Sequence, residues 1–535
     1  MTAIFQTVLF MMAVLVAVAV AAKRLKTAPS ILLVVAGIGM AFVPGLPRVQ
    51  LAPELVLLVI LPPLIYSAGV AMSWRDFKFN LRPIALLAFG CVVFTTCAVA
   101  AAAHYLLGFE WQIGFVLGAI IAPPDVVAPL AIARRLGLPR RLAVVLEGEG
   151  LANDATALIL YRFAVIAVST GAFSLEEAAG SFGLIVVGEI FYGIGVGWLS
   201  LRLRKWAREP RVEITLSLMT PYVAYWIPEH LHGSGVLATV ACGLYVSWNG
   251  PRLIAPATRL QGIFFWDLIV YLIEGFVFLL TGLQARTLVE QTHTFSLREL
   301  AIATAVTTAI VIAARFVWVF PATYVPRWLS KSLRTRDPSP PWQGPFLLSF
   351  TGIRGVVSLA AALGLPYFID SGAAFPHRDL ILFVTFGVII ITLVGQGLLL
   401  PSVVRALGLT TLGQEERMNE LQAEIAARQA ALEEVSKRFD AFVAERELPD
   451  EVIELLRTRN ASRQQILPKD MSDALGAMRQ SAKIKKELID AERDFVYQLL
   501  RDGKITDEAR RRIEYELDLE EASVANRGSD GGGWM

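Results

Sequence analysis

The fold is decided by an apolar segment that no continuous helix can occupy, residues 118–129, with the sequence GAIIAPPDVVAP. Pro123, Pro124 and Pro129 have no backbone N–H to donate, so a helix cannot pass through them undisturbed. Asp125 lies directly at the interruption. The segment therefore predicts a helix that is broken around one carboxylate in an apolar environment.

The composition of the chain indicates that this environment is a membrane. Of the 535 residues, 55% are hydrophobic and only 18% are charged, whereas about a quarter are charged in soluble domains. This composition excludes disordered, collagen-like and disulfide-scaffold chains. The formal net charge of +2 gives no reason to expect a nucleic acid partner. The cysteines and histidines lack the spacing of metal ligands, so no cofactor is expected.

Apolar runs between polar breaks predict thirteen membrane-spanning helices, each of which needs about 20 apolar residues. Basic residues gather in the breaks after odd-numbered segments, so the positive-inside rule places the N-terminus outside and the C-terminus in the cytoplasm. The first segment lacks the basic start and cleavage pattern of a signal peptide and is predicted to be a span. The segments are residues 4–22, 29–43, 52–71, 84–107, 113–133, 142–168, 179–200, 212–228, 234–248, 260–283, 298–323, 344–366 and 380–405.

Two carboxylates are predicted to meet near the middle of the membrane. At about 1.5 Å per residue, Asp125 and Asp154 each lie roughly 18 Å into their segments, near the centre of a core about 30 Å thick. A charge there costs about 2.5–3.5 kcal/mol, so such residues usually face a cavity and have a function. Asp154 belongs to residues 146–156, LEGEGLANDAT. The helical angle directs Glu149 away from Asp154, so Glu149 needs a different partner.

The twelfth segment has a second candidate interruption in residues 350–358, FTGIRGVVS, where glycines flank Arg354. With the seventh segment as a linker, segments five and twelve are the fifth members of two halves of opposite orientation. Interrupted segments at matching positions of inverted halves indicate the binding site of a transporter. Asp125 and Arg354 have the charges that balance the dipole ends left by broken helices.

The residues around this crossing suit a small monovalent cation, because hard cations prefer oxygen ligands. The candidate ligands are the Asp154 carboxylate, the Asn153 amide, the carbonyls near Pro123 and Pro124, and the hydroxyl of Thr156 or Ser358. Burial favours the protonated form of a carboxyl group, so H⁺ and the cation compete for Asp154. This competition predicts a transporter, not an enzyme, that exchanges one ion for the other.

Other interpretations stay open. Proline and glycine kink many membrane helices without forming a site, and Asp125 also fits a helix cap. Asp267 and Glu274, seven residues apart on one helix face, fit either a water-filled funnel or a polar contact. A cation channel would use the same polar midplane, but it would need a continuous pore.

The chain divides by composition into a transmembrane domain, residues 1–408, and a cytosolic helical domain, residues 409–535. Apolar residues recur with helical spacing in residues 415–446, 451–457 and 472–500, before a glycine-rich end at 531–533. A solvated helical appendage or a short coiled coil is the favoured interpretation, and a regulatory role is the alternative.

Four motifs taken together resemble the monovalent cation:proton antiporter-1 family of bacterial sodium/proton exchangers. They are residues 118–132, residues 146–154, TGIRGVVS at 351–358 and LVGQG at 393–397. DGKITD at 502–507 is similar to the cytosolic end of bacterial members. The resemblance implies a homodimer in the lipid bilayer of the inner membrane that exchanges Na⁺ for H⁺ in pH homeostasis. It also implies a six-helix core that moves past a dimerisation domain.

The resemblance further implies roles for single residues, and members with an asparagine before the shared aspartate are usually electroneutral. The implied roles are Asp154 as the carboxylate shared by cation and proton, Asn153 as its neighbour, Glu149 and Arg315 as a structural ion pair, and Asp125 and Arg354 as the charges of the two broken helices.

The chain also departs from the family pattern. Val126 follows Asp125 where a proline is common, Gly150 stands where many members have a serine, and Glu274 stands where asparagine is usual. These differences reduce the number of candidate ligands for the cation. Na⁺ is the expected cation, and a K⁺/H⁺ antiporter, or one for Li⁺, is the alternative.

Overall fold

The computed structural model of the chain describes residues 2–25, 27–44, 51–171, 175–231, 233–292, 295–445, 450–465, 471–502 and 504–528. Within these ranges it contains helices and, apart from one isolated bridge between Phe368 and Ala374, no extended pairing. The all-α prediction is therefore confirmed. The chain separates into two compact units, Met1–Leu412 and Gly413–Met535.

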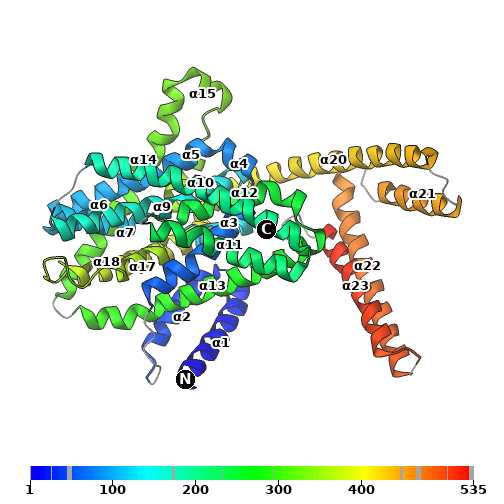
Figure 1. Cartoon of the computed structure of the whole chain (residues 1–535), viewed down its shortest axis with the longest axis horizontal. Coiled ribbons are helices and arrows are strands. Elements are labelled where there is room, and N and C mark those ends of the chain that lie inside the picture. The colour runs from blue at the N-terminus through cyan, green and yellow to red at the C-terminus, as the bar shows by residue number, and fades with distance from the viewer. Residues whose placement is uncertain are drawn as a thin grey trace. The chain divides into compact units, whose positions relative to one another are not determined.

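The first unit is a bundle of mostly long helices (Figure 1). Its elements are α1 (Thr2–Leu25), α2 (Pro29–Ala41), η1 (Leu55–Ile60), α3 (Leu61–Ala71), α4 (Trp74–Phe79), α5 (Leu81–Ala85), η2 (Leu86–Cys91), α6 (Val92–Leu107), α7 (Trp111–Ile121), α8 (Val127–Leu136), α9 (Arg140–Thr170), α10 (Leu175–Ala207), α11 (Pro210–His230), α12 (Val236–Leu253), α13 (Pro256–Gln291), α14 (Leu297–Leu329), α15 (Lys331–Arg336), α16 (Gln343–Phe350), α17 (Val356–Leu363), α18 (Arg378–Ile390), η3 (Ile391–Gln396) and α19 (Gly397–Ala406).

Every one of the thirteen predicted membrane segments is occupied by helix. Seven helical stretches in the described residues are long and apolar enough to cross a membrane, and three shorter apolar helices accompany them. One of the short ones is α7, which ends at Ile121 because the prolines that follow cannot continue it. Several helices extend beyond the predicted apolar segments, because the residues at their ends are polar and were therefore not counted as part of a membrane span.

The two predicted interruptions are both present. Residues 122–126 separate α7 from α8, and residues 351–355 separate α16 from α17. The three π-helical turns η1, η2 and η3 were not predicted. A π-helical turn inserts one residue into an otherwise regular helix, and apolar periodicity does not reveal it.

The helices of the first unit pack in two groups. In one group α2 packs on α13, and α12 packs on both α3 and α10; in the other, α7 packs on α6 and α9, and α14 packs on α6, α16 and α18. Close approach at the α6–α7 contact requires Gly118, because a Cβ there would lie 2.5 Å from the carbonyl oxygen of Thr96. Contacts of α9 with α12 and of α13 with α18 join the groups.

The second unit consists of α20 (Leu409–Glu445), which begins in the first unit, α21 (Asp450–Gln465), α22 (Met471–Arg501) and α23 (Asp507–Gly528). The three helical stretches predicted here coincide with α20, α21 and α22. Helices α22 and α23 pack through Ile489, Leu517 and Val524, and an Arg493–Asp518 ion pair of 2.6 Å flanks this contact. The glycine-rich end at 531–533 lies outside the described residues, and the cytosolic location of this unit remains a prediction.

Candidate functional site

The backbones of the two interrupted segments meet directly. The N–H of Asp125 donates a hydrogen bond to the carbonyl oxygen of Ile353, with an N···O distance of 2.7 Å. The approach is close because residue 355 is glycine: a Cβ on Gly355 would lie 2.5 Å from the Cβ of Asp125. The interruptions therefore satisfy each other's backbone groups, which have no water available in an apolar interior.

Each interruption also supplies a charged side chain that lies at the end of a helix. Asp125 lies at the start of α8, and Arg354 lies at the end of α7. The Asp125 carboxylate accepts a hydrogen bond of 3.1 Å from the N–H of Val127, at the positive end of α8. The Arg354 guanidinium donates to the carbonyl of Ala122, at the negative end of α7. Both arrangements have the sign that a helix dipole favours. Oδ2 of Asp125 and Nε of Arg354 are buried without a hydrogen-bond partner among the described residues.

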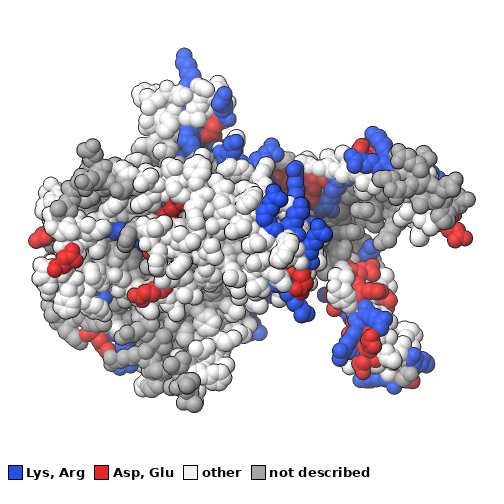
Figure 2. Space-filling view, viewed as in Figure 1, with Lys and Arg blue, Asp and Glu red and all other residues white. Residues whose placement is uncertain are grey.

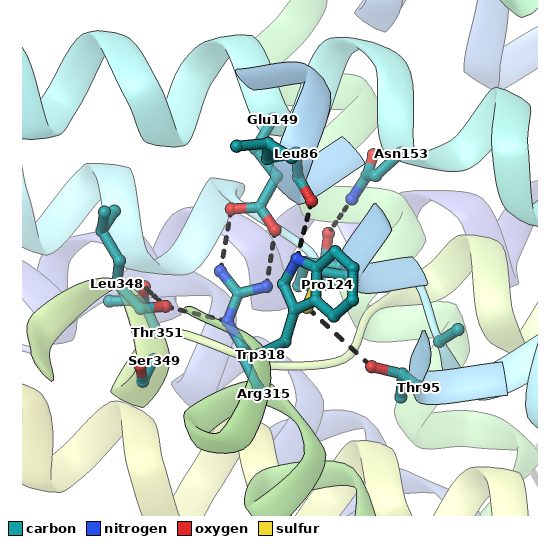
Figure 3. A network of polar contacts seen from close by, with 12 residues as sticks. Leu86, Thr95, Pro124, Glu149, Asn153, Arg315, Trp318, Leu348, Ser349 and Thr351 are labelled. Atoms are coloured by element: carbon teal, nitrogen blue, oxygen red, sulfur yellow. Dashed lines mark hydrogen bonds and ion pairs between the residues drawn. The ribbon is translucent and has the colours of Figure 1, made fainter. Parts of the chain in front are cut away.

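Asn153 connects α9 to the first interruption. Its Nδ2 donates to the carbonyl of Pro124 at 2.6 Å, and its Oδ1 accepts from the N–H of Asp154 at 2.7 Å. Figure 3 shows Asn153 directed at Pro124 from the helix above it. Asn153 is fully buried and Asp154 is half-buried. Within the described residues, the carboxylate of Asp154 accepts no hydrogen bond, so its oxygens are available to a ligand.

Three carboxyl groups share this region. Asp154 and Glu274 are both close enough to Asp125 to interact with it electrostatically. Glu274 comes from α13, on the other group of packed helices, and is half-buried. Like charges repel, so a positive ion bound beside Asp125 would reduce its repulsion with each of these acids.

Glu149 and Arg315 form a buried ion pair beside the crossing. Both guanidinium NH₂ groups of Arg315 donate to the carboxylate of Glu149, at 2.5 and 2.8 Å, and Nε donates to the carbonyl of Leu348 at 2.8 Å. Their side chains are 0% and 2% exposed. Figure 3 shows the guanidinium between the carboxylate and the carbonyl. Through this bidentate ion pair and the bond to Leu348, Arg315 connects α14 to α9 and α16.

The two predicted hydroxyl ligands are not brought to the carboxylate of Asp154 by any hydrogen bond among the described residues. Thr156 donates to the carbonyl of Ala152 in its own helix, at 3.4 Å. Ser358 is buried in the first turn of α17. Their ligand roles remain predictions.

Sequence reasoning missed Thr392, whose hydroxyl accepts a hydrogen bond of 3.0 Å from the N–H of Arg354. This contact holds the second interruption against η3. The only available signal in the sequence was a single threonine in a long apolar run. Such a threonine is also typical of a helix in which the hydroxyl donates to a backbone carbonyl one turn earlier. Thr392 does this as well, donating to Val388 at 2.8 Å.

The described residues at the crossing offer mainly single oxygen groups and no cluster of metal-binding side chains. The described residues contain no group of three or more His, Cys, Asp or Glu side chains arranged to hold a metal ion. What they offer instead is one available carboxylate beside a buried amide and unwound backbone carbonyls, which suits a weakly held monovalent cation.

Comparison with known proteins gives a consistent result. The family described as "Sodium/hydrogen exchanger, transmembrane" matches residues 10–406. An uncharacterized Na⁺/H⁺ exchanger of Mycobacterium tuberculosis is 36% identical over 386 residues, which are 71% of this chain and 70% of that protein. The Na⁺/H⁺ antiporter ApNhaP of Aphanothece halophytica is 33% identical over 420 residues, 77% of this chain and 75% of that protein.

Another relative is named for a wider range of cations. The sodium, potassium, lithium and rubidium/H⁺ antiporter of Bacillus pumilus is 34% identical over 384 residues, 69% of this chain and 57% of that protein. Among solved structures, the sodium proton antiporter MjNhaP1 of Methanocaldococcus jannaschii superposes with a TM-score of 0.60 and 16% identity, over 76% of this chain and 99% of that one. At this identity the superposition shows a shared fold.

Proposed function

The chain belongs to the sodium/hydrogen exchanger family, and from this premise we infer that it exchanges a monovalent cation for H⁺ across a membrane. Asp154 is the carboxylate that both ions use in turn. Asp125 and Asn153 complete the cation site together with the carbonyl of Pro124.

One observation carries this assignment. The Asp154 carboxylate accepts no hydrogen bond from the described residues, yet its neighbour Asn153 is fixed to the interruption at Pro124. An acid placed beside unwound backbone, half-buried and not committed to a protein donor, can be neutralised either by H⁺ or by a cation. It cannot hold both, and this exclusion couples the two fluxes.

The exchange is electroneutral in this proposal. One carboxylate carries one positive charge in each direction, and Asn153 is a neutral amide that adds no second titrating group. Asp125 is engaged with the N–H of Val127, where the end of α8 stabilises its charge.

Na⁺ is the proposed physiological cation, with K⁺ and Li⁺ as the competing choices. The relatives divide between names that specify Na⁺ and a name that includes potassium, lithium and rubidium. A direct comparison of the three cations is therefore the first measurement to make.

The proposed setting is the bacterial inner membrane, with the N-terminus outside and residues 409–535 in the cytoplasm. The concentration of basic residues in alternate polar breaks supports this orientation. The proposed assembly is a homodimer.

Transport in everted membrane vesicles tests the function. Vesicles from a host without its own antiporters are energised, and a fluorescent dye reports the internal acid. Addition of Na⁺, K⁺ or Li⁺ should release the dye quenching through the wild type and not through Asp154→Asn. Asp370→Asn, an equally conservative change at an exposed acid, is the matched control and should transport normally.

Two results would contradict the proposal. Exchange that survives in a folded Asp154→Asn protein would remove Asp154 from the mechanism. A cation flux that follows voltage and needs no proton gradient would indicate a channel.

A further inference from the structure

Three arginines surround a single aspartate in the first unit. Asp337 accepts hydrogen bonds from Arg82 at 2.9 Å, Arg141 at 2.7 Å and Arg327 at 2.7 Å. They come from α5, α9 and α14. The segment after α15 carries Asp337 into the centre of the group.

The cluster has more positive charge than its one carboxylate can balance, although some donors have other partners. Arg141 Nε donates to Asn80 Oδ1 at 3.2 Å, and Arg327 donates to the carbonyls of Asp337 and Thr323. One carboxylate faces three guanidinium groups, each with five N–H donors. The nearest acid on α4, Asp76, is already paired with Arg140 at 2.6 Å. Nη1 of Arg82 is buried and has no hydrogen-bond partner among the described residues. A ligand with several negatively charged oxygens, such as a phosphate, would satisfy these donors.

The same three arginines line an apolar cavity of about 70 Å³. Its walls include Leu86, Leu87, Leu142, Val145, Val319 and Leu348. A cavity of this size accepts only the first part of an acyl chain. A phosphate above and a hydrocarbon below are common to phospholipids, and three arginines around one carboxylate favour a phospholipid with a net negative charge. A free phosphate would use only the arginines.

The position of the cluster agrees with a lipid ligand. Arg82 and Arg141 precede the fourth and sixth predicted spans, and Arg327 follows the eleventh. All three therefore lie at the predicted cytoplasmic boundary of the membrane, where headgroup phosphates are found. Figure 2 shows Lys and Arg side chains over the region that α4, α5 and α15 occupy in Figure 1. Basic pockets between membrane helices on this side are suited to lipid headgroups.

We propose that Arg82, Arg141 and Arg327, with the apolar cavity that they line, bind one anionic phospholipid of the cytoplasmic leaflet. The phosphate lies against the arginines, and the start of one acyl chain enters between α5, α9, α14 and α16. The site is separate from Asp154, so the proposal stands or fails independently of the exchange mechanism.

Native mass spectrometry of the purified full chain tests the site. The protein is titrated with phosphatidylglycerol and, separately, with phosphatidylcholine of the same acyl chains, and retained lipid is counted for each protomer. The wild type should retain one phosphatidylglycerol in preference to phosphatidylcholine. The Arg82→Gln/Arg141→Gln double variant should bind it about 25-fold more weakly, at about fivefold for each arginine near a membrane surface.

The variants are chosen to separate binding from folding. Arg327 stays in the double variant, so Asp337 keeps a partner. Ala322→Phe fills the cavity from α14 and leaves every arginine in place; it should also weaken retention of the lipid. Arg75→Gln is the control, because Arg75 is an exposed arginine on α4 at the same boundary and outside the cluster. It should bind like the wild type.

Three outcomes would overturn the proposal. Equal loss of binding in Arg75→Gln would indicate a general surface charge effect. Unchanged binding in both the double variant and Ala322→Phe would place the lipid elsewhere. Displacement of the lipid by millimolar inorganic phosphate, together with full binding in Ala322→Phe, would identify an anion site without a role for the acyl chain.

Discussion

The backbone N–H of Asp125 donates to the carbonyl of Ile353 at 2.7 Å, so the two interrupted segments form a single crossing. The residues are 228 positions apart in the chain, yet each satisfies a backbone group that the other interruption exposes. In an apolar interior an unpaired backbone group costs several kcal/mol. The crossing is therefore a rigid frame on which Asp125 and Arg354 are held.

Gly355→Ala should damage this frame. An added Cβ would lie 2.5 Å from the Cβ and 2.9 Å from Oδ2 of Asp125, distances that force one of the segments to shift. Overpacking of this kind costs about 1–3 kcal/mol, and we expect exchange to fall more than tenfold in the vesicle assay. Gly395→Ala is the control, because nothing lies within 4 Å of a Cβ at that position. Equal transport in both variants would show that the crossing tolerates movement.

Breaking the Glu149–Arg315 pair should lower stability strongly. Both side chains are almost completely buried, so Glu149→Gln leaves an uncompensated guanidinium. Removal of one partner of such a pair costs about 3–5 kcal/mol. The measurement is the free energy of unfolding in mixed detergent micelles. At the exposed pair Arg286–Glu290, with side chains 39% and 38% exposed, Glu290→Gln should cost about 0–1 kcal/mol. Similar losses at the two sites would contradict the structural role of the buried pair.

The Arg162–Glu229 contact should affect transport kinetics. Arg162 on α9 donates to the Glu229 carboxylate on α11 and to the carbonyl of Gly233. Helix α11 packs on α10 and α12, so the contact joins the two groups of packed helices. If these groups move past each other during exchange, the contact exists in only one state. We expect Arg162→Gln and Glu229→Gln to change the maximal rate by similar factors, about fivefold for a half-exposed pair worth about 1 kcal/mol. The double variant should add little more.

Ser200→Ala is the control for this prediction. The hydroxyls of Ser200 on α10 and Thr220 on α11 are hydrogen-bonded at 2.7 Å, and both helices belong to one group of packed helices. It should alter stability and leave the maximal rate nearly unchanged. Independent, additive effects of Arg162→Gln and Glu229→Gln would contradict the coupling.

Glu274→Gln should weaken the apparent affinity for the cation. Glu274 interacts electrostatically with Asp125, and loss of an acid near the site removes an attraction on the order of 1 kcal/mol, or roughly fivefold in affinity. The half-saturating cation concentration in the vesicle assay reports it. Asp267→Asn, at an exposed acid seven residues earlier on α13, is the matched control. An equal shift in both variants would indicate a long-range field rather than a local contribution.

The sequence by itself determined where the apolar helices lie and where two of them are interrupted. Apolar length and missing proline donors act within a few residues, so they can be read without knowledge of neighbours. The prolines at 123 and 124 end α7 wherever that helix lies. The same local reasoning showed that Glu149 needed a partner other than Asp154, and the similar depth of Asp125 and Asp154 in the membrane stays a prediction.

Only the tertiary structure decided which groups meet. The residues alone left the partner of Glu149 open, and only the family resemblance implied Arg315, 166 positions away. The carbonyl that completes their contact, on Leu348, has no side-chain signal at all. Thr392 and the π-helical turns likewise depend on how helices pack. Backbone carbonyls are present at every residue, so their selection as partners follows from packing in three dimensions and cannot be read from residue type.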